Sequence, residues 1–174
     1  FVPQKVITFK DELTGSEIIM IPDDKLSVCV MIDFETDVLG SQTARLENID
    51  DFKTHIAPCR TFSFLHDLEH LLENGLIKGG DLNNAIVYVD KPLEESNMKK
   101  LKEAFGRKSI AVKPNGILDN LTLNFPNEAA RHKLLDVLGD LSLIGIPTRA
   151  KIIASKPGHK TNTTFAKKVA SIIS

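Results

Sequence analysis

Residues 126–143 read PNEAARHKLLDVLGDLSL. Apolar side chains recur in this stretch with the three- and four-residue spacing of one helix face; they are Leu134, Leu135, Val137, Leu138 and Leu141. Gly145 and Pro147 come soon after, and both residue types end helices. The stretch therefore predicts the longest helix of the chain, with one side turned toward a core.

Short apolar runs and further helical patterns lie on both sides of this helix. Strands are predicted at residues 6–9, 17–22, 26–34, 43–46, 84–89, 110–112, 117–123 and 150–154. Helices are predicted at residues 48–57, 63–74, 94–105 and 162–173. Because the order of strands and helices is mixed, we expect an α+β fold, in which a mixed sheet and its packed helices form a two-layer sandwich.

The composition argues against several classes of function. Of the 174 residues, 42% are hydrophobic and 26% are charged, which is typical of a folded domain. A formal net charge of −1 gives no basic field for a nucleic acid backbone. The apolar runs are too short to span a bilayer, and Cys29 and Cys59 lack the paired spacing of a disulfide framework or a thiolate zinc site. We expect a cytosolic protein with reduced cysteines, no nucleic acid partner and no transmembrane segment.

Three polar side chains of the long helix, His132, Asp136 and Asp140, follow one another at intervals of four. Residues four apart stack on one helix face. Zinc binds imidazole nitrogen and carboxylate oxygen at about 2.0–2.2 Å, so His132 and Asp136 could reach one ion while Asp140 orients another group. The same spacing is common on the solvated faces of ordinary helices. By itself, the motif leaves a metal site and a plain surface both open.

Another histidine, His159, follows the turn Pro157-Gly158 after the predicted strand at residues 150–154. Loops at strand ends often carry catalytic residues. An exposed loop histidine with no catalytic role is the more common case, so the local sequence alone favours that interpretation for His159.

Five segments together resemble the UDP-3-O-acyl-N-acetylglucosamine deacetylases, the zinc amidases of lipid A biosynthesis. The segments are Arg60-Thr61-Phe62, Gly75-Leu76, Gly79-Gly80 leading to Asn84-Ala85-Ile86-Val87, Arg131-His132-Lys133-x-x-Asp136-x-x-Gly139-Asp140-Leu141, and Lys156-x-Gly158-His159. Their order and spacing also fit the family. The resemblance covers most of residues 59–174 and implies that residues 1–174 are the C-terminal domain, with the N-terminal domain absent from this chain.

The resemblance also implies which residues act. His132 and Asp136 correspond to two of the three zinc ligands. The third ligand, a histidine, is expected from the missing N-terminal half, together with the glutamate that acts as general base. His159 corresponds to the catalytic histidine and Asp140 to the residue that hydrogen-bonds it. Thr61 corresponds to a hydroxyl near the developing oxyanion.

Substrate-binding residues follow from the same resemblance. Residues 63–89 resemble a βαβ insert whose apolar passage holds the acyl chain. Phe62 corresponds to an aromatic residue that packs on the substrate and Lys133 to a lysine near the sugar nucleotide. Further candidates for this passage and the substrate are Phe64, Leu68, Ile77, Gly80 and Val87. The implied enzyme is cytoplasmic, comes from a Gram-negative bacterium and releases acetate from UDP-3-O-acyl-N-acetylglucosamine.

The implied chemistry assigns separate tasks to these groups. A catalytic zinc ion activates its bound water, and the metal and Thr61 could share the negative charge that builds on the acetamide oxygen. The amine must leave with a proton, which a protonated His159 held by Asp140 could donate, because histidine changes its charge near neutral pH. With two ligands only, this chain alone is expected to bind zinc poorly and to have little activity.

Two other interpretations remain open. The segment His66-Asp67-Leu68-Glu69-His70 fits the inverted zinc-protease motif H-x-x-E-H, with two histidine ligands and Glu69 as base. Leucines at helical spacing, Leu65, Leu68 and Leu72, compete for the buried face and would leave both histidines on the opposite side. Alternatively, the chain is a non-catalytic lobe that docks another domain, which an exposed apolar patch near His132 would support.

Overall fold

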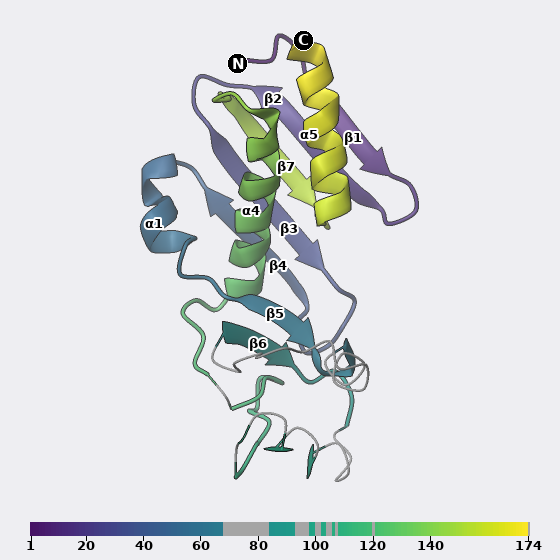
Figure 1. The fold of residues 1–174 in the computed structure, drawn as a ribbon, viewed down its shortest axis with the longest axis vertical. Helices are drawn as coiled ribbons and strands as arrows, with labels where there is room; N and C mark the ends of the chain where they lie inside the picture. Colours follow the sequence, from purple (N-terminus) through teal and green to yellow (C-terminus); the bar gives the residue numbers. More distant parts are fainter. Residues whose placement is uncertain are drawn as a thin grey trace. The chain divides into compact units, whose positions relative to one another are not determined.

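The computed structural model describes residues 1–67, 84–92, 98–99, 102–103, 106, 108–119 and 121–173. The chain divides into two compact units, which are described separately (Figure 1). Unit 1 comprises Phe1–Asp33, Ser41–Cys59 and Asn127–Ser174, and unit 2 comprises Phe34–Gly40 and Arg60–Pro126. Strands and helices are combined in a mixed order, which confirms the predicted α+β class.

The sheet of unit 1 has five strands in the order β1-β2-β7-β3-β4. Their bounds are Ile7–Asp11 (β1), Ser16–Pro22 (β2), Ser27–Asp33 (β3), Ser41–Leu46 (β4) and Ala150–Ser155 (β7). β7 runs parallel to β3, and the other neighbouring pairs are antiparallel. The sheet is therefore mixed, as expected, and every predicted strand of this unit is present, with each end within two residues of its predicted position.

Two long helices, α4 (Glu128–Leu141) and α5 (His159–Ile173), lie on one face of this sheet (Figure 1). α4 contacts β3 and β4, whereas α5 contacts β1 and β2, and the two helices pack on each other. Their inward side chains are fully buried: Leu134 and Val137 on α4, Phe165 and Val169 on α5. The burial of this apolar stripe against the sheet is what fixes the outward face of each helix.

The ends of these helices differ from the prediction in one place that matters for function. α4 continues into a 3-10 turn, η3 (Ser142–Ile144), and ends at Gly145 with φ of +82°, as predicted. α5, however, begins at His159 rather than at Asn162, because the Asn162 N–H donates to the Gly158 carbonyl at 2.9 Å and closes the first turn. The prediction that His159 lies in a loop is therefore wrong.

A smaller helical segment joins β4 to unit 2. The predicted helix at residues 48–57 is present as η1 (Ile49–Asp51) followed by α1 (Phe52–His55). The Asn48 side chain accepts a hydrogen bond from the Asp50 N–H at 3.2 Å, which is the capping role expected of asparagine.

Unit 2 contains two parallel strands, β5 (Thr61–Phe64) and β6 (Ala85–Tyr88). The helix predicted from residue 63 is wrong at its start, because Ser63 and Phe64 belong to β5 and helical backbone begins at Leu65. Phe62 and Phe64 are two residues apart and both contact Phe34. This period of two is the spacing of one strand face, and it overrides the helical pattern. Residues 68–74, the rest of that prediction, lie outside the described residues.

The predicted strands at residues 110–112 and 117–123 are not present as strands in their described residues, which are 110–112, 117–119 and 121–123. Two isolated bridges, Tyr88↔Ile117 and Val112↔Leu118, take their place. The ladder stops early because the Ala111 N–H donates to the side-chain carboxylate of Asp119 at 3.0 Å instead of to a backbone carbonyl. Leu65, Val87, Ile110 and Leu118 form a buried apolar cluster in this unit. Of the predicted helix at residues 94–105, only residues 98–99 and 102–103 are described, and they are helical.

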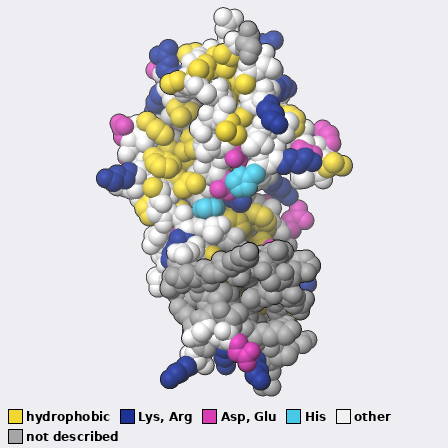
Figure 2. All heavy atoms as spheres, viewed as in Figure 1, with side chains coloured by type: hydrophobic (Ala, Val, Ile, Leu, Met, Phe, Trp, Pro, Cys, Tyr) yellow, Lys and Arg dark blue, Asp and Glu magenta, His cyan; other side chains and the backbone are white. Residues whose placement is uncertain are grey.

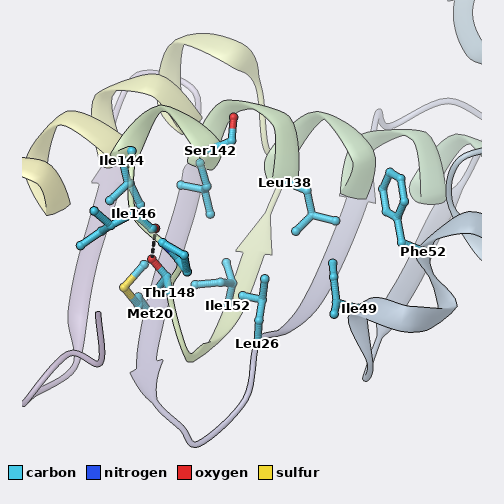
Figure 3. A pocket seen from close by; sticks show the side chains of 13 residues that line it. Met20, Leu26, Ile49, Phe52, Leu138, Ser142, Ile144, Ile146, Thr148 and Ile152 are labelled. Atoms are coloured by element: carbon cyan, nitrogen blue, oxygen red, sulfur yellow. Dashed lines mark hydrogen bonds between the residues drawn. The ribbon is translucent and has the colours of Figure 1, made fainter.

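Unit 1 also exposes apolar surface. Hydrophobic side chains gather on the face shown in Figure 2, beside the histidines. Between α4, η3 and the sheet lies an apolar hollow of about 480 Å³ (Figure 3). Met20, Leu138 and Ile152 line it, and Ile49 and Ile146, which also line it, remain 49% and 42% exposed. Within the described residues, no helix is long and apolar enough to cross a membrane.

Candidate active site

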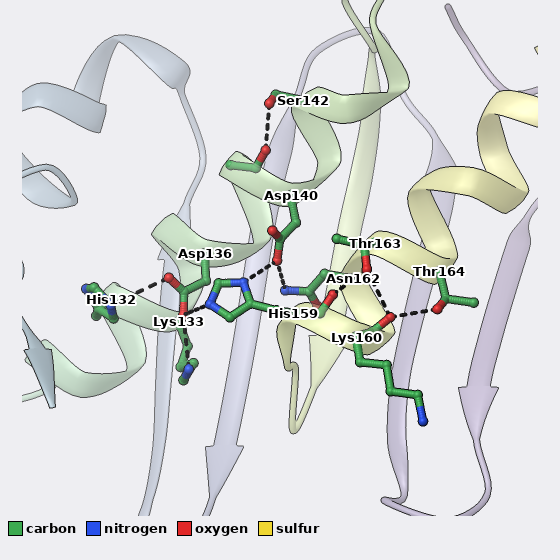
Figure 4. Close-up of polar contacts among 11 residues, drawn as sticks. His132, Lys133, Asp136, Asp140, Ser142, His159, Lys160, Asn162, Thr163 and Thr164 are labelled. Carbon is green, nitrogen blue, oxygen red and sulfur yellow. Dashed lines mark hydrogen bonds and ion pairs between the residues drawn. The ribbon is translucent and has the colours of Figure 1, made fainter. Parts of the chain in front are cut away.

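His132 and Asp136 project from the same side of α4, as their spacing predicts (Figure 4). The His132 Nε2 lies 3.5 Å from the Asp136 Oδ1, and the two side chains are only 18% and 10% exposed. Asp140 follows one turn later on the same side and is 16% exposed. The three side chains therefore form a half-buried polar row instead of a fully solvated face.

His159 joins this row from α5. Its Nδ1 lies 2.8 Å from the Asp140 Oδ2, and its Nε2 lies 3.9 Å from the Asp136 Oδ2 (Figure 4). The ring is 69% exposed, so a bound molecule can reach it. Two segments that were predicted separately from the sequence thus meet at one place, which we call the His–Asp row: His132, Asp136, Asp140 and His159.

The turn between β7 and α5 places His159. Lys156 has a φ of +47°, which is uncommon for a residue with a side chain. Its N–H donates to the Met31 carbonyl at 2.8 Å and so fastens the turn to the end of the neighbouring strand β3. Pro157 is buried directly after it. The starting point of α5, and with it the position of His159, is fixed by the parallel pairing of β3 and β7.

A backbone carbonyl orients the other histidine. The His132 Nδ1 lies 3.2 Å from the Cys59 carbonyl oxygen, which can only accept, so this hydrogen-bond pattern assigns the proton to Nδ1. Arg131 keeps the Cys59 segment in place by donating to the His55 carbonyl at 2.9 Å. The lone pair of the His132 Nε2 is then directed toward Asp136.

This arrangement suits a cation. In the neutral ring, a nitrogen lone pair and a carboxylate oxygen face each other, and two acceptors have no direct attraction unless a proton or a metal ion lies between them. A histidine that hydrogen-bonds a carbonyl through its other nitrogen is the usual form of a metal-bound imidazole. Within the described residues, no group of three or more His, Cys, Asp or Glu side chains has the geometry to hold a metal ion. His132 and Asp136 are therefore two candidate ligands and not a complete metal site in the part of the chain that the structure describes.

Lys133 and Asn162 complete the surroundings of the row. The Lys133 Nζ lies 3.0 Å from the Asp136 Oδ2. The Asn162 Nδ2 donates to the Asp140 Oδ2 at 2.9 Å. Asn162 was not among the predicted site residues, because the predicted helix began at this residue. Had the helix been predicted from His159, the three-residue spacing would have placed Asn162 beside it.

Comparison with known proteins decides the family. The family model described as "UDP-3-O-acyl N-acetylglycosamine deacetylase" matches residues 2–108 and 96–171. The chain belongs to this family. The predicted resemblance is thereby confirmed.

Several curated relatives are similar over almost the whole chain. The "Bifunctional enzyme LpxC/FabZ" of Bacteroides thetaiotaomicron is 42% identical over 169 residues, which is 97% of this chain and 37% of that protein. The protein of the same name from Porphyromonas gingivalis is 44% identical over 96% of this chain and 36% of its own length. The "UDP-3-O-acyl-N-acetylglucosamine deacetylase" of Chlamydia pneumoniae is 35% identical over 85% and 45%. The chain therefore spans less than half of each of these deacetylase-family relatives.

The remaining predicted site residues lie in unit 2. Thr61 is exposed on β5, and the Phe62 ring packs edge-on against Phe34 and Tyr88, at centroid distances of 5.4 and 6.0 Å. Phe64 and Val87 are buried, at 8% and 1% exposure. The other three, Leu68, Ile77 and Gly80, lie outside the described residues. The substrate roles of all these residues in the deacetylase family pattern stay predictions.

The competing H-x-x-E-H motif is described only at its start. His66 places its Nδ1 2.7 Å from the Asp90 Oδ2 and its Nε2 3.3 Å from the Asp67 Oδ1, and its ring stacks on Phe64. Glu69 and His70 lie outside the described residues. Both ring nitrogens of His66 thus face carboxylates of unit 2, and membership in the deacetylase family gives this motif no support.

Proposed function

We propose that this chain is part of a zinc-dependent hydrolase that removes the acetyl group of UDP-3-O-acyl-N-acetylglucosamine and releases acetate, the committed step of lipid A biosynthesis. Family membership supports this reaction. The observation that carries the proposal is the meeting of His159 with the His132–Asp136 pair. The chain would be the C-terminal half of a cytoplasmic enzyme of a Gram-negative bacterium.

His132 and Asp136 would hold the zinc ion. One nitrogen and one oxygen ligand, one helical turn apart and 3.5 Å from each other, fit the donor atoms that zinc accepts. A bound zinc ion supplies an activated water and polarises the carbonyl of the substrate. Catalytic zinc usually has three protein ligands, so we infer that another histidine and the general-base glutamate come from the part of the polypeptide outside this chain.

His159 would donate the proton that the leaving amine needs. Asp140 accepts from the His159 Nδ1 at 2.8 Å, so Nε2 is the atom that can give up a proton to the substrate. That atom lies 3.9 Å from Asp136, beside the pair of metal ligands. The exposure of the His159 ring leaves room for a sugar amide. Asp140 would hold the ring in the orientation that this transfer needs.

Other residues would bind the rest of the substrate. Lys133, held at 3.0 Å from Asp136, would place a positive charge near the sugar nucleotide. We further propose that Thr61 donates to the oxyanion and that Phe62 packs on the substrate. Residues 63–89 would form the acyl passage, with Phe64, Leu68, Ile77, Gly80 and Val87 as its candidate contacts.

The non-catalytic docking lobe has one observation in its favour. The apolar hollow of unit 1 and the exposed Ile49 and Ile146 at its rim form a surface of the kind that packs against another domain. Because the relatives are more than twice as long as the matched part, we propose that the remaining polypeptide covers this surface. Docking and catalysis are then two properties of the same half, and docking alone would be its function only if the complete protein had no deacetylase activity.

The test uses the full-length protein loaded with zinc. His132→Ala should lose the zinc ion and the activity, because it removes a ligand. Asp140→Ala should keep the zinc and lower kcat about 10- to 100-fold, as expected for a partner that orients a reacting group. The control for metal binding is His66→Ala, which should keep the wild-type zinc content, because His66 is not one of the proposed ligands. Zinc content is measured by elemental analysis and kcat by acetate release.

Different results would contradict the proposal in different ways. If His132→Ala and Asp140→Ala both kept the wild-type zinc content and rate, the site assignment would be wrong. Loss of zinc in His66→Ala, with His132→Ala unaffected, would favour the inverted protease motif. The 174-residue chain by itself should show little activity, since it would supply two ligands only.

A further inference from the structure

Asn162 stands out among the residues of α5 because it is a polar side chain in a place that does not favour one. It is fully buried, at 0% exposure, in the first turn of the helix. Asparagine is a poor helix former because its amide competes for backbone hydrogen bonds. Burying an amide also costs free energy unless its hydrogen bonds are made. A side chain that carries both costs is expected to have a specific task.

One end of the Asn162 amide is used and the other is not. Its Nδ2 donates to the Asp140 Oδ2 at 2.9 Å. Its Oδ1 is buried without a hydrogen-bond partner in the part of the chain that the structure describes. Reversing the amide would bring this oxygen against the Asp140 carboxylate, where two acceptors repel each other. The orientation of the Asn162 amide is therefore set by its hydrogen bond to Asp140, and in this orientation its Oδ1 has no hydrogen-bond partner among the described residues.

The hydrogen bond from Asn162 matters because its acceptor, the Asp140 Oδ2, also contacts His159. The Asp140 Oδ2 also lies 2.8 Å from the His159 Nδ1, so one carboxylate oxygen accepts from both residues (Figure 4). A carboxylate oxygen has lone pairs for two such bonds. With Asn162 in place the carboxylate cannot turn away from His159. The Nδ1 of His159 then keeps its proton, and Nε2 is left for the His132–Asp136 side.

We propose that Asn162 is a positioning residue that acts through Asp140 to fix the tautomer and orientation of His159. Its effect on catalysis rests on the proposed function, but its effect on the His159 ring does not. Groups that hold a catalytic or ligating side chain in this way typically change activity by 10- to 100-fold when removed. We expect the lower end of this range for Asn162, because Asp140 itself remains.

The experiment compares Asn162→Ala, Asp140→Ala and the double variant in the zinc-loaded full-length protein. Asn162→Ala should lower kcat about tenfold, with KM and zinc content unchanged. In the Asp140→Ala background, the same substitution should lower kcat no further, because the group through which Asn162 acts is already gone. A similar fall in both backgrounds would mean an independent structural effect and would overturn the proposal.

A second measurement needs no substrate. The side-chain nitrogens of His159 are observed by NMR in protein labelled with ¹⁵N-histidine, at a pH where the ring is neutral, and are assigned by their loss in His159→Gln. The wild type should show the Nδ1–H tautomer, and Asn162→Ala a mixture of the two. An unchanged tautomer would overturn the proposal. Asn162→Ser, which is too short to reach Asp140, is measured alongside so that a folded variant is in hand if alanine unfolds the protein.

Two comparisons separate this proposal from the proposed function. Asn48→Ala is the matched control, since Asn48 also uses its amide, as acceptor from the Asp50 N–H at 3.2 Å, but lies at the start of η1 outside the His–Asp row; kcat and the tautomer should both stay unchanged. If His159→Gln and Asp140→Ala kept full kcat while Asn162→Ala altered the tautomer, the proposed function would fail and the positioning role would stand. If those two variants lost kcat while Asn162→Ala changed neither kcat nor tautomer, only the positioning role would fail.

Discussion

Units 1 and 2 place their candidate site residues by different means. In unit 1, His132, Asp136 and Asp140 lie on a 14-residue helix whose buried side is fixed by a five-stranded sheet. In unit 2, Thr61 and Phe62 lie on a four-residue strand beside a second strand of the same length. A long element with one buried side converts sequence spacing directly into spatial neighbours, whereas a short one depends on contacts that the spacing does not reveal.

Contacts between rings take the place of a long element in unit 2. Phe34, Phe62, Phe64 and Tyr88 meet at centroid distances from 5.4 to 6.4 Å, mostly edge to face. Such pairs add about 0.5–1.5 kcal/mol each beyond the area that they bury. Phe34 is separated from the others by more than twenty residues of sequence. No local pattern in the sequence predicts this meeting, so the comparison is best tested by substitutions that act on one unit at a time.

The largest effect is expected from the core of unit 1. Leu134 is fully buried where α4 meets the sheet, and Leu134→Ala should lower the free energy of unfolding by about 2–5 kcal/mol because it leaves a cavity. Hydrogen exchange of the α4 and β3 amides measures this loss. Leu143→Ala is the control: Leu143 is 68% exposed, and its truncation should change stability by less than about 0.5 kcal/mol. Equal losses in the two variants would refute the view that the buried stripe of α4 fixes its outward face.

A smaller loss is expected from a turn of unit 2. Gly116 has a φ of +76°, and a Cβ placed on it would lie 2.7 Å from the Val38 Cγ1 and 2.9 Å from the Val38 Cβ. Gly116→Ala should therefore cost about 2–3 kcal/mol, from backbone strain and from displacement of Val38. Thermal unfolding measures the loss. In a Val38→Gly background, which removes both close atoms, the cost should fall to about 1 kcal/mol, the strain alone; an unchanged cost would mean that Val38 does not set it.

The difference between units 1 and 2 also shows which parts of the fold and of the candidate site can be predicted from the sequence alone. Helical spacing predicted the row of His132, Asp136 and Asp140, and the resemblance to the deacetylase family predicted that His159 belongs with it. The start of α5 was missed, because it depends on the bond from Lys156 to Met31 across two parallel strands. Asn162 was missed for the same reason, because its hydrogen bond to Asp140 can be seen only in the folded structure. In unit 2, the strand β5 was taken for the beginning of a helix, because its pairing with β6 and its ring contacts are long-range.

The smallest expected effect on stability concerns Gly139. At this position, a change that stabilises helix α4 is expected to impair the candidate site on the same helix. Gly139 lies inside α4, and a Cβ built on it meets no atom within 4 Å. Gly139→Ala should raise the free energy of unfolding by about 0.5–1 kcal/mol, because alanine is the better helix former. Yet Gly139 is seven residues after His132 and three after Asp136, so its methyl group would extend from the face of the candidate site.

We therefore expect Gly139→Ala to melt at a higher temperature and to have a lower kcat in the full-length enzyme, the trade that stabilising changes near a site often bring. Thr164→Ala, at an exposed position on α5, is the control for helix propensity and should leave kcat unchanged. A Gly139→Ala enzyme that gained stability and kept its full kcat would show that the space above this glycine is not used by substrate. The His–Asp row would then be approached from the α5 side, where His159 is exposed.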